Sequence, residues 1–485
     1  MKHRDKESVC LHPEPMTVDR FRESLKGCND VVEYTLSVHI NGEVDVALFY
    51  CGGLIDNQQL QLALLPQLEK WTEQLDHTAE GEVEGEALRP GRLFHYIPGG
   101  DEAYLYARLF AGSVILAFSD RAGFYEFDIS SQPGRNPEES TMEVSLKGPR
   151  DGFVELLSVN VALVRKRLRT PDMHVEYRRI GRESMTEVAL LYMSGITKPE
   201  LVKEARRRLD AIRIPSLNGG GELEELLSDR PFSVFPLIEY VGRPDYVVQS
   251  LMNGKVIVMV DGTPSALIAP ADMLLLIKSP EDAHLPFYFV SLERLLRLFG
   301  LVLALFLPGF WVALSAFNTD QIPYSLLATI TISRIGLPVS ATMEMFIMLT
   351  TFELFREAGV RLPRPVGQTV SVVGGLIVGD AAIRAGLTSP TMLVAAAVTS
   401  VATFTLVNQS LTGSVSVVRY AILLLSSVLG IFGFFVGVFA VLIYLCSLES
   451  FGHSYLSPLA PLKFRQLAPA LMQNPWKLRI RRRKG

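Results

Sequence analysis

Residues Thr351–Asp380 read TFELFREAGVRLPRPVGQTVSVVGGLIVGD. Carboxylates, arginines and prolines stand here directly beside long apolar runs, and closely spaced glycines follow them. Because a charge at membrane depth is costly, charges in such a place mark a polar pathway or a contact with a partner. The stretch therefore indicates a membrane protein with a polar pathway or an assembly site, and it argues against a soluble enzyme.

Apolar runs dominate the last part of the chain. The protein has 485 residues, of which 20% are charged, and a net charge of −4. These averages hide two unlike parts: residues 1–290 carry charges throughout, whereas residues 295–447 are mostly apolar. The apolar stretches are Leu298–Phe317, Ile322–Phe352, Val366–Gly386, Leu387–Val407 and Val417–Cys446. At about 1.5 Å of helical rise per residue, such a stretch can cross a hydrocarbon core of roughly 30 Å. Leu298–Phe317, Tyr420–Cys446 and the 34 residues between Arg384 and Arg419 carry no formal charge. The alternative, buried helices of a large soluble protein, fits such long uncharged runs poorly.

Both ends of the chain carry signals of a cytoplasmic location. The first 30 residues contain no continuous apolar segment of the kind found in a signal peptide, and the basic tail KLRIRRRKG favours the cytoplasm. Five crossings would place the two ends on opposite sides. We therefore expect an all-α polytopic membrane domain of about four spanning helices plus one short re-entrant or pore-lining segment, Val366–Gly386, whose irregular backbone must face protein or water.

Charged residues within and beside the apolar stretches are candidates for a functional site. They are Glu344, Glu353, Arg356, Glu357, Asp380 and Arg384. In a structural interpretation, Glu353 and Glu357 share a helix face and pair with Arg356, Arg361 or Arg364. In a functional interpretation, Glu344 lines an ion route or senses a partner. Asp380 and Arg384 are spaced i,i+4 and can neutralise each other.

Two GxxxG pairs predict a close approach between helices. They are Gly375 with Gly379 and Gly433 with Gly437. Small residues at this spacing let two backbones come together. Contact within one subunit and contact between subunits both remain open at this point.

The first part of the chain alternates between strand-like and helical patterns, which indicates two small cytoplasmic α/β subdomains. Strand-like runs include Val31–Ile40, Val44–Tyr50, Ser113–Phe118, Phe124–Ile129 and Glu187–Met193. We expect an N-terminal tail at 1–30, subdomains at 31–147 and 148–290, a transmembrane domain at 291–450 and a basic cytoplasmic tail at 451–485. In the segment that joins the subdomains, Arg165, Lys166, Arg167 and Arg169 form a solvated or interface face, or contact anionic headgroups.

The sequence contains no P-loop, GxSxG or HExxH motif, and its eight histidines are scattered. The four cysteines, Cys10, Cys28, Cys51 and Cys446, have no CxxC spacing, so we expect unpaired thiols in a reducing compartment. We expect no enzyme activity, no catalytic residues, no cofactor, no metal site and no nucleic-acid partner.

Several segments, in this order along the chain, carry a resemblance to a known family. They are Pro133–Glu138, Gly148–Glu155, Asn160–Arg167, Phe352–Gly359 and Arg361–Gln368. The chain resembles, along nearly its whole length, the A subunit of the GerA family of spore germinant receptors. It departs from the family pattern at Leu349, Asp380 and Arg384, where the family carries a carboxylate, a glutamine and a glutamate.

The resemblance implies a location, partners and an activity. It implies a multi-pass protein of the spore inner membrane, with the N-terminal region and C-terminal tail facing the cytoplasm or spore core, in contact with membrane lipid. It further implies a homo-oligomer, a pentamer, that works with a transporter-like B subunit and a lipoprotein C subunit. Such a channel releases monovalent cations during spore germination once nutrient is sensed.

Our leading hypothesis is a nutrient-gated cation channel subunit. Pore and gate candidates are Gln368, Thr369, Ser371, Val372, Val373, Gly375 and Gly379. Hydroxyl-bearing and small residues leave room for water, and the two valines can form an apolar gate that closes by dewetting. The alternatives are a non-conducting scaffold or accessory subunit of a germination complex and a secondary transporter, whose internal repeat is not found in the sequence.

Overall fold

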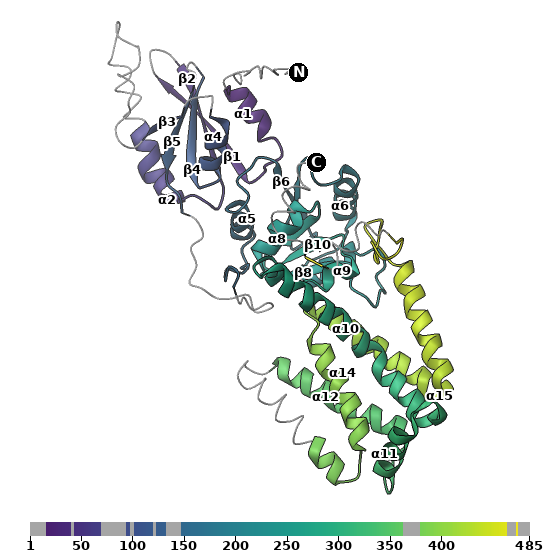
Figure 1. Ribbon diagram of the computed structural model, residues 1–485. Helices are drawn as coiled ribbons and strands as arrows, with labels where there is room; N and C mark the ends of the chain where they lie inside the picture. Colours follow the sequence, from purple (N-terminus) through teal and green to yellow (C-terminus); the bar gives the residue numbers. More distant parts are fainter. Residues whose placement is uncertain are drawn as a thin grey trace, which may run out of the picture. The chain divides into compact units, whose positions relative to one another are not determined.

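The computed structural model describes residues 16–39, 43–68, 94–97, 101–119, 123–131, 147–361, 379–462 and 472–473. The chain divides into two compact units, Met1–Leu227 with Tyr240–Ala269, and Ser228–Glu239 with Pro270–Gly485. The first unit combines sheets and helices, and the second consists almost entirely of helices. An α/β region followed by a helical region was expected from the sequence, and this coarse fold class is confirmed (Figure 1).

The first sheet has the strand order β1-β2-β4-β5-β3, and its neighbouring strands are antiparallel. Its strands are β1 (Val31–His39), β2 (Glu43–Cys51), β3 (His95–Ile97), β4 (Ser113–Phe118) and β5 (Phe124–Asp128), and the helices of this part are α1 (Val18–Ser24), α2 (Asn57–Gln59), η1 (Leu60–Leu64) and α4 (Glu102–Leu109). Side chains alternate along β2: Ala47 and Phe49 join a core with α1 and α4, whereas Val46 and Leu48 join a core with η1. Both faces of this sheet are therefore covered.

The second sheet has the order β6-β7-β9-β10-β8. Its strands are β6 (Met173–Ile180), β7 (Thr186–Met193), β8 (Glu239–Val241), β9 (Val256–Val260) and β10 (Ala266–Ala269), and its helices are α5 (Leu157–Arg165), α6 (Pro199–Ala211), α7 (Gly220–Leu227) and α8 (Pro244–Met252). Every residue of the apolar strand β9 is buried, and α5, α6 and α8 pack against it. Continuous apolar strands of this kind occur where both faces of a sheet are covered.

A buried ion pair joins these two parts of the first unit. Arg165, the last residue of α5, donates to both carboxylate oxygens of Asp30, at 2.7 and 2.6 Å, and to the carbonyl of Thr170 at 2.9 Å. Its side chain is fully buried, and its guanidinium lies 4.3 Å from the ring centre of Phe110. Of the alternatives for this basic segment, a solvated face is therefore wrong for Arg165, whose partner Asp30 stands far away in the sequence and is brought to it only by folding.

Two buried cysteines lie beside this ion pair. The thiol of Cys51 donates to Asp30 at 3.4 Å, and that of Cys28 donates to the carbonyl of Pro171 at 3.3 Å. Burial raises the pKa of Cys28 to about 11, so this thiol is protonated and unreactive at neutral pH. Cys28, Cys51 and Cys446 are free thiols, as expected from the sequence, and Cys10 lies outside the described residues.

The second unit is a bundle of helices around α10. Its elements are α9 (Met273–Leu276), η2 (Pro280–Ala283), α10 (Phe287–Val312), η3 (Ala313–Phe317), η4 (Thr319–Gln321), α11 (Tyr324–Arg334), α12 (Ala341–Arg361), α14 (Pro390–Phe404), α15 (Gln409–Ser447), and the short strands β11 (Glu449–Ser450) and β12 (His453–Ser454). Helix α10 packs against α14 and α15, and α12 packs against α14. Apolar side chains from these helices form two buried clusters.

Within the described residues, two helical segments are long and apolar enough to cross a membrane, by length and composition: Phe287–Phe317 and Gln409–Ser447. The apolar stretch Ile322–Phe352 is not one helix, because α11 ends at Arg334 and α12 begins at Ala341. Gly336, at φ 86°, and Pro338 stand in the gap, and both residues disfavour a continuous helix. The number of about four crossings stays a prediction.

Helix α15 is broken at Gly430, and the chain turns back on itself there. Gly430 has φ 61° and ψ −140°, a conformation open in practice only to glycine, and the next amide, of Ile431, donates to the side chain of Asn318 at 3.1 Å. A Cβ at Gly433 would lie 2.1 Å from the carbonyl oxygen of Leu425, and one at Gly437 would lie 3.3 Å from Ile422. In a straight helix, positions 422 and 437 would be about 22 Å apart. Their contact therefore shows that the chain reverses direction between them.

Residues 409–429 and 431–447 are therefore two antiparallel arms of a hairpin. The apolar stretch Val417–Cys446 is therefore not one straight helix, because it contains the turn, and the number of times it crosses a membrane stays a prediction. The glycines of the second GxxxG pair face the first arm of the same chain. The interpretation of this pair as a contact within one subunit is thus confirmed.

The hairpin predicts opposite effects for two glycines of α15. Gly433→Ala forces a methyl group against a carbonyl, and we expect it to cost about 2–3 kcal/mol or more and to lower the Tm. Gly413 has open space around it and is the matched control; Gly413→Ala should stabilise the helix by up to about 1 kcal/mol. Thermal unfolding of the full chain in detergent, followed by circular dichroism, measures both. Equal Tm values for the two variants would contradict the hairpin.

Candidate functional site

Glu344 lies in the first turn of α12 and is fully buried. Its Oε2 accepts hydrogen bonds from the amide and the hydroxyl of Ser389, at 2.9 and 3.1 Å. Its Oε1 lies 3.3 Å from the guanidinium of Arg334, at the end of α11. Ser389 is the residue before α14, so the carboxylate lies where the N-termini of α12 and α14 meet.

This position explains how a carboxylate is tolerated inside the bundle. Helix N-termini carry partial positive charge, and here two of them and Arg334 surround one anion. The Oε1 atom is buried and, apart from the ion pair with Arg334, receives no hydrogen bond from the described residues. The arrangement therefore holds Glu344 in place and leaves one oxygen able to accept a further hydrogen bond.

Glu353, further along α12, belongs to a second polar cluster. It accepts a short hydrogen bond from Arg356, one turn away, and another at 3.2 Å from Arg419 on the first arm of α15. Arg419 is only 2% exposed and also donates to Thr403 of α14 and to Ser416, at 3.0 and 3.2 Å. One guanidinium thus joins α12, α14 and α15.

The two clusters lie at opposite ends of α14. Ser389 precedes its first turn and Thr403 belongs to its last, while the corresponding carboxylates are Glu344 and Glu353 of α12. Helices α12 and α14 therefore run in the same direction. The chain leaves α12 at one end of this pair, and Gly379 lies beside Leu393, near the other end.

The remaining candidates are more exposed or lie elsewhere. Asp380 and Arg384 form the expected i,i+4 ion pair at 2.9 Å, and both side chains are exposed. Glu357 is exposed on α12, and Gly379 is buried. The other pore and gate candidates lie outside the described residues; they are Gln368, Thr369, Ser371, Val372, Val373 and Gly375.

Arg334, Ser389 and Arg419 take part in the polar clusters but were not recognised from the sequence. Arg419 had a usable signal, since it is the one charged residue in the sequence between positions 409 and 447. Such a charge must find a partner within the protein. Which carboxylate it meets depends on the packing of α12 against α15, and no local spacing reveals that.

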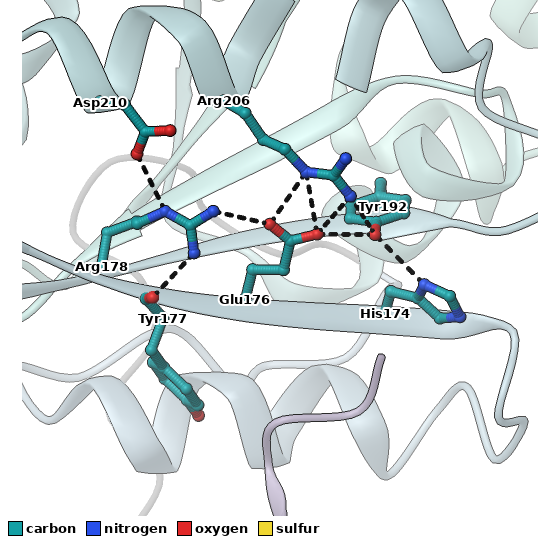
Figure 2. Close-up of polar contacts among 7 residues, drawn as sticks. All are labelled: His174, Glu176, Tyr177, Arg178, Tyr192, Arg206 and Asp210. Carbon is teal, nitrogen blue, oxygen red and sulfur yellow. Dashed lines mark hydrogen bonds and ion pairs between the residues drawn. The ribbon is translucent and has the colours of Figure 1, made fainter. Parts of the chain in front are cut away.

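A further polar cluster occupies the second sheet of the first unit. Figure 2 shows Glu176 of β6 between Arg178 of the same strand and Arg206 of α6. Glu176 accepts from Arg206 at 2.6 Å, from Tyr192 of β7 at 2.7 Å and from Arg178 at 3.1 Å. The Tyr192 hydroxyl also lies 3.2 Å from Nδ1 of His174. These contacts join two strands to a helix.

Burial and hydrogen bonding shift the pKa values of this cluster. Burial alone would raise the pKa of Glu176, but hydrogen bonds from Arg206 and Tyr192 outweigh it and hold this pKa below its ordinary value. Burial lowers the pKa of His174. Burial and the bond to Glu176 raise the pKa of Tyr192 to about 12. At neutral pH the cluster therefore contains an ionised carboxylate, a neutral imidazole and a neutral phenol.

Neither region has the composition of a metal site. Across the described ranges, no group of three or more histidine, cysteine, aspartate or glutamate side chains is placed to hold a metal ion. The clusters instead pair carboxylates with arginines. Their common effect is to fix neighbouring helices and strands to one another.

The described features define a class of protein: an α/β region with two five-stranded sheets, and an apolar helical unit in which buried charges are paired. The sequence model described as "Bacillus/Clostridium GerA spore germination protein" matches residues 19–484, and the chain belongs to this family. The resemblance drawn from the sequence is thereby confirmed.

Known relatives match most of the chain. Spore germination protein XA of Bacillus anthracis is 40% identical over 434 residues, which cover 89% of this chain and 87% of that protein. Spore germination protein KA of Bacillus subtilis (strain 168) is 34% identical over 458 residues, 94% and 83% of the two chains. The N-terminal domain of the A subunit of the Bacillus megaterium spore germinant receptor GerK3 is 28% identical, covers 53% of this chain and 96% of that one, and superposes with a TM-score of 0.40.

The cluster around Arg419 predicts a large cost for breaking one buried ion pair. Among the described residues, Arg419→Met leaves Glu353 with its neighbour Arg356 as the remaining partner, and we expect a loss of about 3–5 kcal/mol of stability. Arg384→Met breaks an exposed pair and should cost less than about 1 kcal/mol. Thermal unfolding of the full chain in detergent compares them. Equal effects of the two substitutions would show that the buried contact is not important for the bundle.

The cluster around Glu176 predicts loss of stability in acid. The pKa of Glu176 is lower in the folded protein than the ordinary value of about 4.3. The stability that the ionised Glu176 contributes is therefore fully present above about pH 4.3 and is lost as the pH falls through the folded pKa. Glu176→Gln should therefore lower the Tm at pH 7 and differ less from the wild type in acid. Glu187→Gln, which breaks an exposed pair with Arg179, is the control and should cost less than about 1 kcal/mol. A Tm difference for Glu176→Gln that does not change with pH would refute the assignment.

Proposed function

We propose that this chain is the membrane subunit of a spore germinant receptor and forms a homo-oligomeric, nutrient-gated cation channel that triggers germination. The relatives named above are spore germination proteins, which supports the role in germination. The observation that carries the channel proposal is the pairing of buried charges inside an apolar helical unit. Burying a charge in an apolar environment costs free energy, and buried charges in membrane proteins mark pathways or assembly contacts.

The polar clusters provide a frame for a pore. Arg419 joins α12, α14 and the first arm of α15, and Glu344 joins the start of α12 to the start of α14. Between the end of α12 and Gly379 stands the glycine-spaced stretch that we propose as the pore wall. Its Gln368, Thr369 and Ser371 would face water, and Val372 and Val373 would form the apolar gate.

The proposal includes a location and partners. The chain would lie in the spore inner membrane, with both ends on the side of the spore core, as a pentamer with a transporter-like B subunit and a lipoprotein C subunit. The hydroxyl of Tyr444, near the end of α15, accepts a hydrogen bond from the amide of Val234, which precedes α10 in sequence. A segment that precedes α10 and the end of α15 therefore meet within the helical unit, which supports an even number of crossings.

A non-conducting scaffold is the second candidate. Glu344, Glu353 and Asp380 each pair with an arginine, as they would in a unit whose charges serve assembly. A scaffold and a channel differ in whether ions pass. A flux measurement on the chain itself separates them.

The channel proposal predicts a leak when the gate is made polar. Val373→Ser should raise potassium efflux from liposomes that contain the purified chain at least about tenfold, because a hydroxyl at an apolar constriction favours water. Val428→Ser, at an exposed position of α15, is the matched control and should leave the flux unchanged. If neither the wild type nor Val373→Ser conducts although both are assembled, the channel proposal fails and the scaffold is favoured.

A further inference from the structure

A turn between α7 and β8 exposes one large apolar side chain almost completely. Phe232 is 97% exposed, more than any other large apolar side chain of the described residues. The amide of Ser233 donates to the carbonyl of Arg230 at 3.0 Å, which closes a β-turn. Pro231 and Phe232 are the central residues of this Phe232 turn. The turn belongs to Ser228–Glu239, a segment of the helical unit.

Hydrogen bonds hold the Phe232 turn against the end of α15. On one side of Phe232, Arg230 donates to the hydroxyl of Ser447 at 3.3 Å. On the other side, the amide of Val234 donates to the hydroxyl of Tyr444 at 3.0 Å. The turn therefore has a fixed position at the last turn of this helix, and Phe232 needs little further ordering to bind a partner.

The second arm of α15, residues 431–447, exposes an apolar face along its whole length. The exposed large apolar side chains recur every three or four residues, so they lie on one face of the helix. They are Phe432, Phe435, Val436, Phe439, Leu442 and Ile443, between 39% and 69% exposed. No charged residue stands between positions 431 and 447. A continuous apolar face of this kind marks an interaction with lipid or protein.

Polar residues bound the second arm at both of its ends. At its start, the first amide is bonded to the side chain of Asn318 at 3.1 Å, and the exposed Asp320 follows two residues later. After its end, the first charge in the sequence is Glu449, and Arg230 is bonded to the last turn. The arm between these limits is about 25 Å long, close to a hydrocarbon core of roughly 30 Å. Its length and its polar limits therefore fit a helix that spans the hydrocarbon layer.

The Phe232 turn lies at one of these polar limits, because residues on both sides of Phe232 bond the last turn of the arm. Phenylalanine side chains bind membranes at this level, where they are buried at the boundary between headgroups and acyl chains. Tyrosine is enriched at the same boundary, and Tyr444 lies there. The lipid surface thus accounts both for the apolar face of the arm and for the exposed ring beside its end.

We propose that the Phe232 turn is an interfacial membrane anchor, whose ring inserts among lipid headgroups and the adjoining ends of acyl chains beside the end of α15. The partner is the lipid surface, because the apolar face of the arm leads directly to the turn. Arg230 lies at the level of the lipid phosphates. The inference rests on the membrane location included in the proposed function, and it adds a contact outside the proposed pore segment.

The test measures what surrounds position 232 in the full chain. Phe232→Cys, in a chain that also carries Cys10→Ser and Cys446→Ser, is spin-labelled and reconstituted in lipid nanodiscs. Cys28 and Cys51 are buried and remain unlabelled. Collisions of the label with oxygen, which concentrates in lipid, are compared with collisions with a water-soluble nickel chelate. We expect more collisions with oxygen than with the chelate.

Two further positions calibrate the label in the same background. Phe439→Cys, at a position 60% exposed on the arm, should report lipid. Leu62→Cys, at a position 79% exposed in the α/β region, should report water. Unchanged Tm values show that each labelled variant remains folded.

A second measurement needs no label. Phe232→Glu should lower the Tm of the full chain in nanodiscs, because it places a charge where the ring contacted lipid. Leu62→Glu is the matched control and should leave the Tm unchanged. If Phe232 were surrounded by water, its substitution would be as neutral as that of Leu62, since the ring makes almost no contact within the described chain.

The outcomes separate the anchor from the proposed function. A label that reports lipid at position 439 and water at position 232 overturns the anchor and leaves the proposed function intact. Few collisions with either reagent at position 232 show that protein covers it, which also overturns the anchor. Water at position 439 overturns the membrane location together with the anchor. Lipid at both positions supports the anchor, and an unchanged Tm of Phe232→Glu counts against it.

Discussion

An arginine that is removed from water needs a carboxylate, and this constraint organises both units of the protein. Arg165, Arg243 and Arg419 are each at most 2% exposed, and they meet Asp30, Asp245 and Glu353. A buried ion pair adds little net stability, but removal of one partner is severely destabilising. These pairs therefore restrict which folds are stable. If α5 did not contact Asp30, or α15 did not contact α12, a buried charge would be left unpaired.

In the helical unit, the buried ion pairs lie in the helices that flank the proposed pore segment. Glu344 lies between two helix N-termini and Arg334, and Glu353 is joined to α14 and α15 through Arg419. Both ends of the α12–α14 pair are thus held by charge, while apolar contacts hold the rest. A frame of this kind can position a pore segment or a subunit contact without itself moving.

Local patterns predicted much of this structure, and the misses share one cause. Strands β1, β2, β4, β5 and β7 were recognised because apolar and β-branched residues cluster in short runs, and the Asp380–Arg384 pair followed from its i,i+4 spacing. Strand β6 was missed because MHVEYRRI carries charges that pair only after folding. The turn at Gly430 was missed because its glycine does not differ in sequence context from the other glycines of the apolar run, and the contacts of Gly433 with Leu425 and of Gly437 with Ile422 form only after folding.

The sequence by itself determined the class of fold, the division into α/β and apolar helical parts, and membership of the GerA family, because composition, periodicity and motif order are properties of neighbouring residues. Only the tertiary structure decided that Arg165 is buried on Asp30, that Arg419 meets Glu353, and that α15 is a hairpin. Each of these depends on residues distant in the chain, whose contact follows from how whole helices and sheets pack.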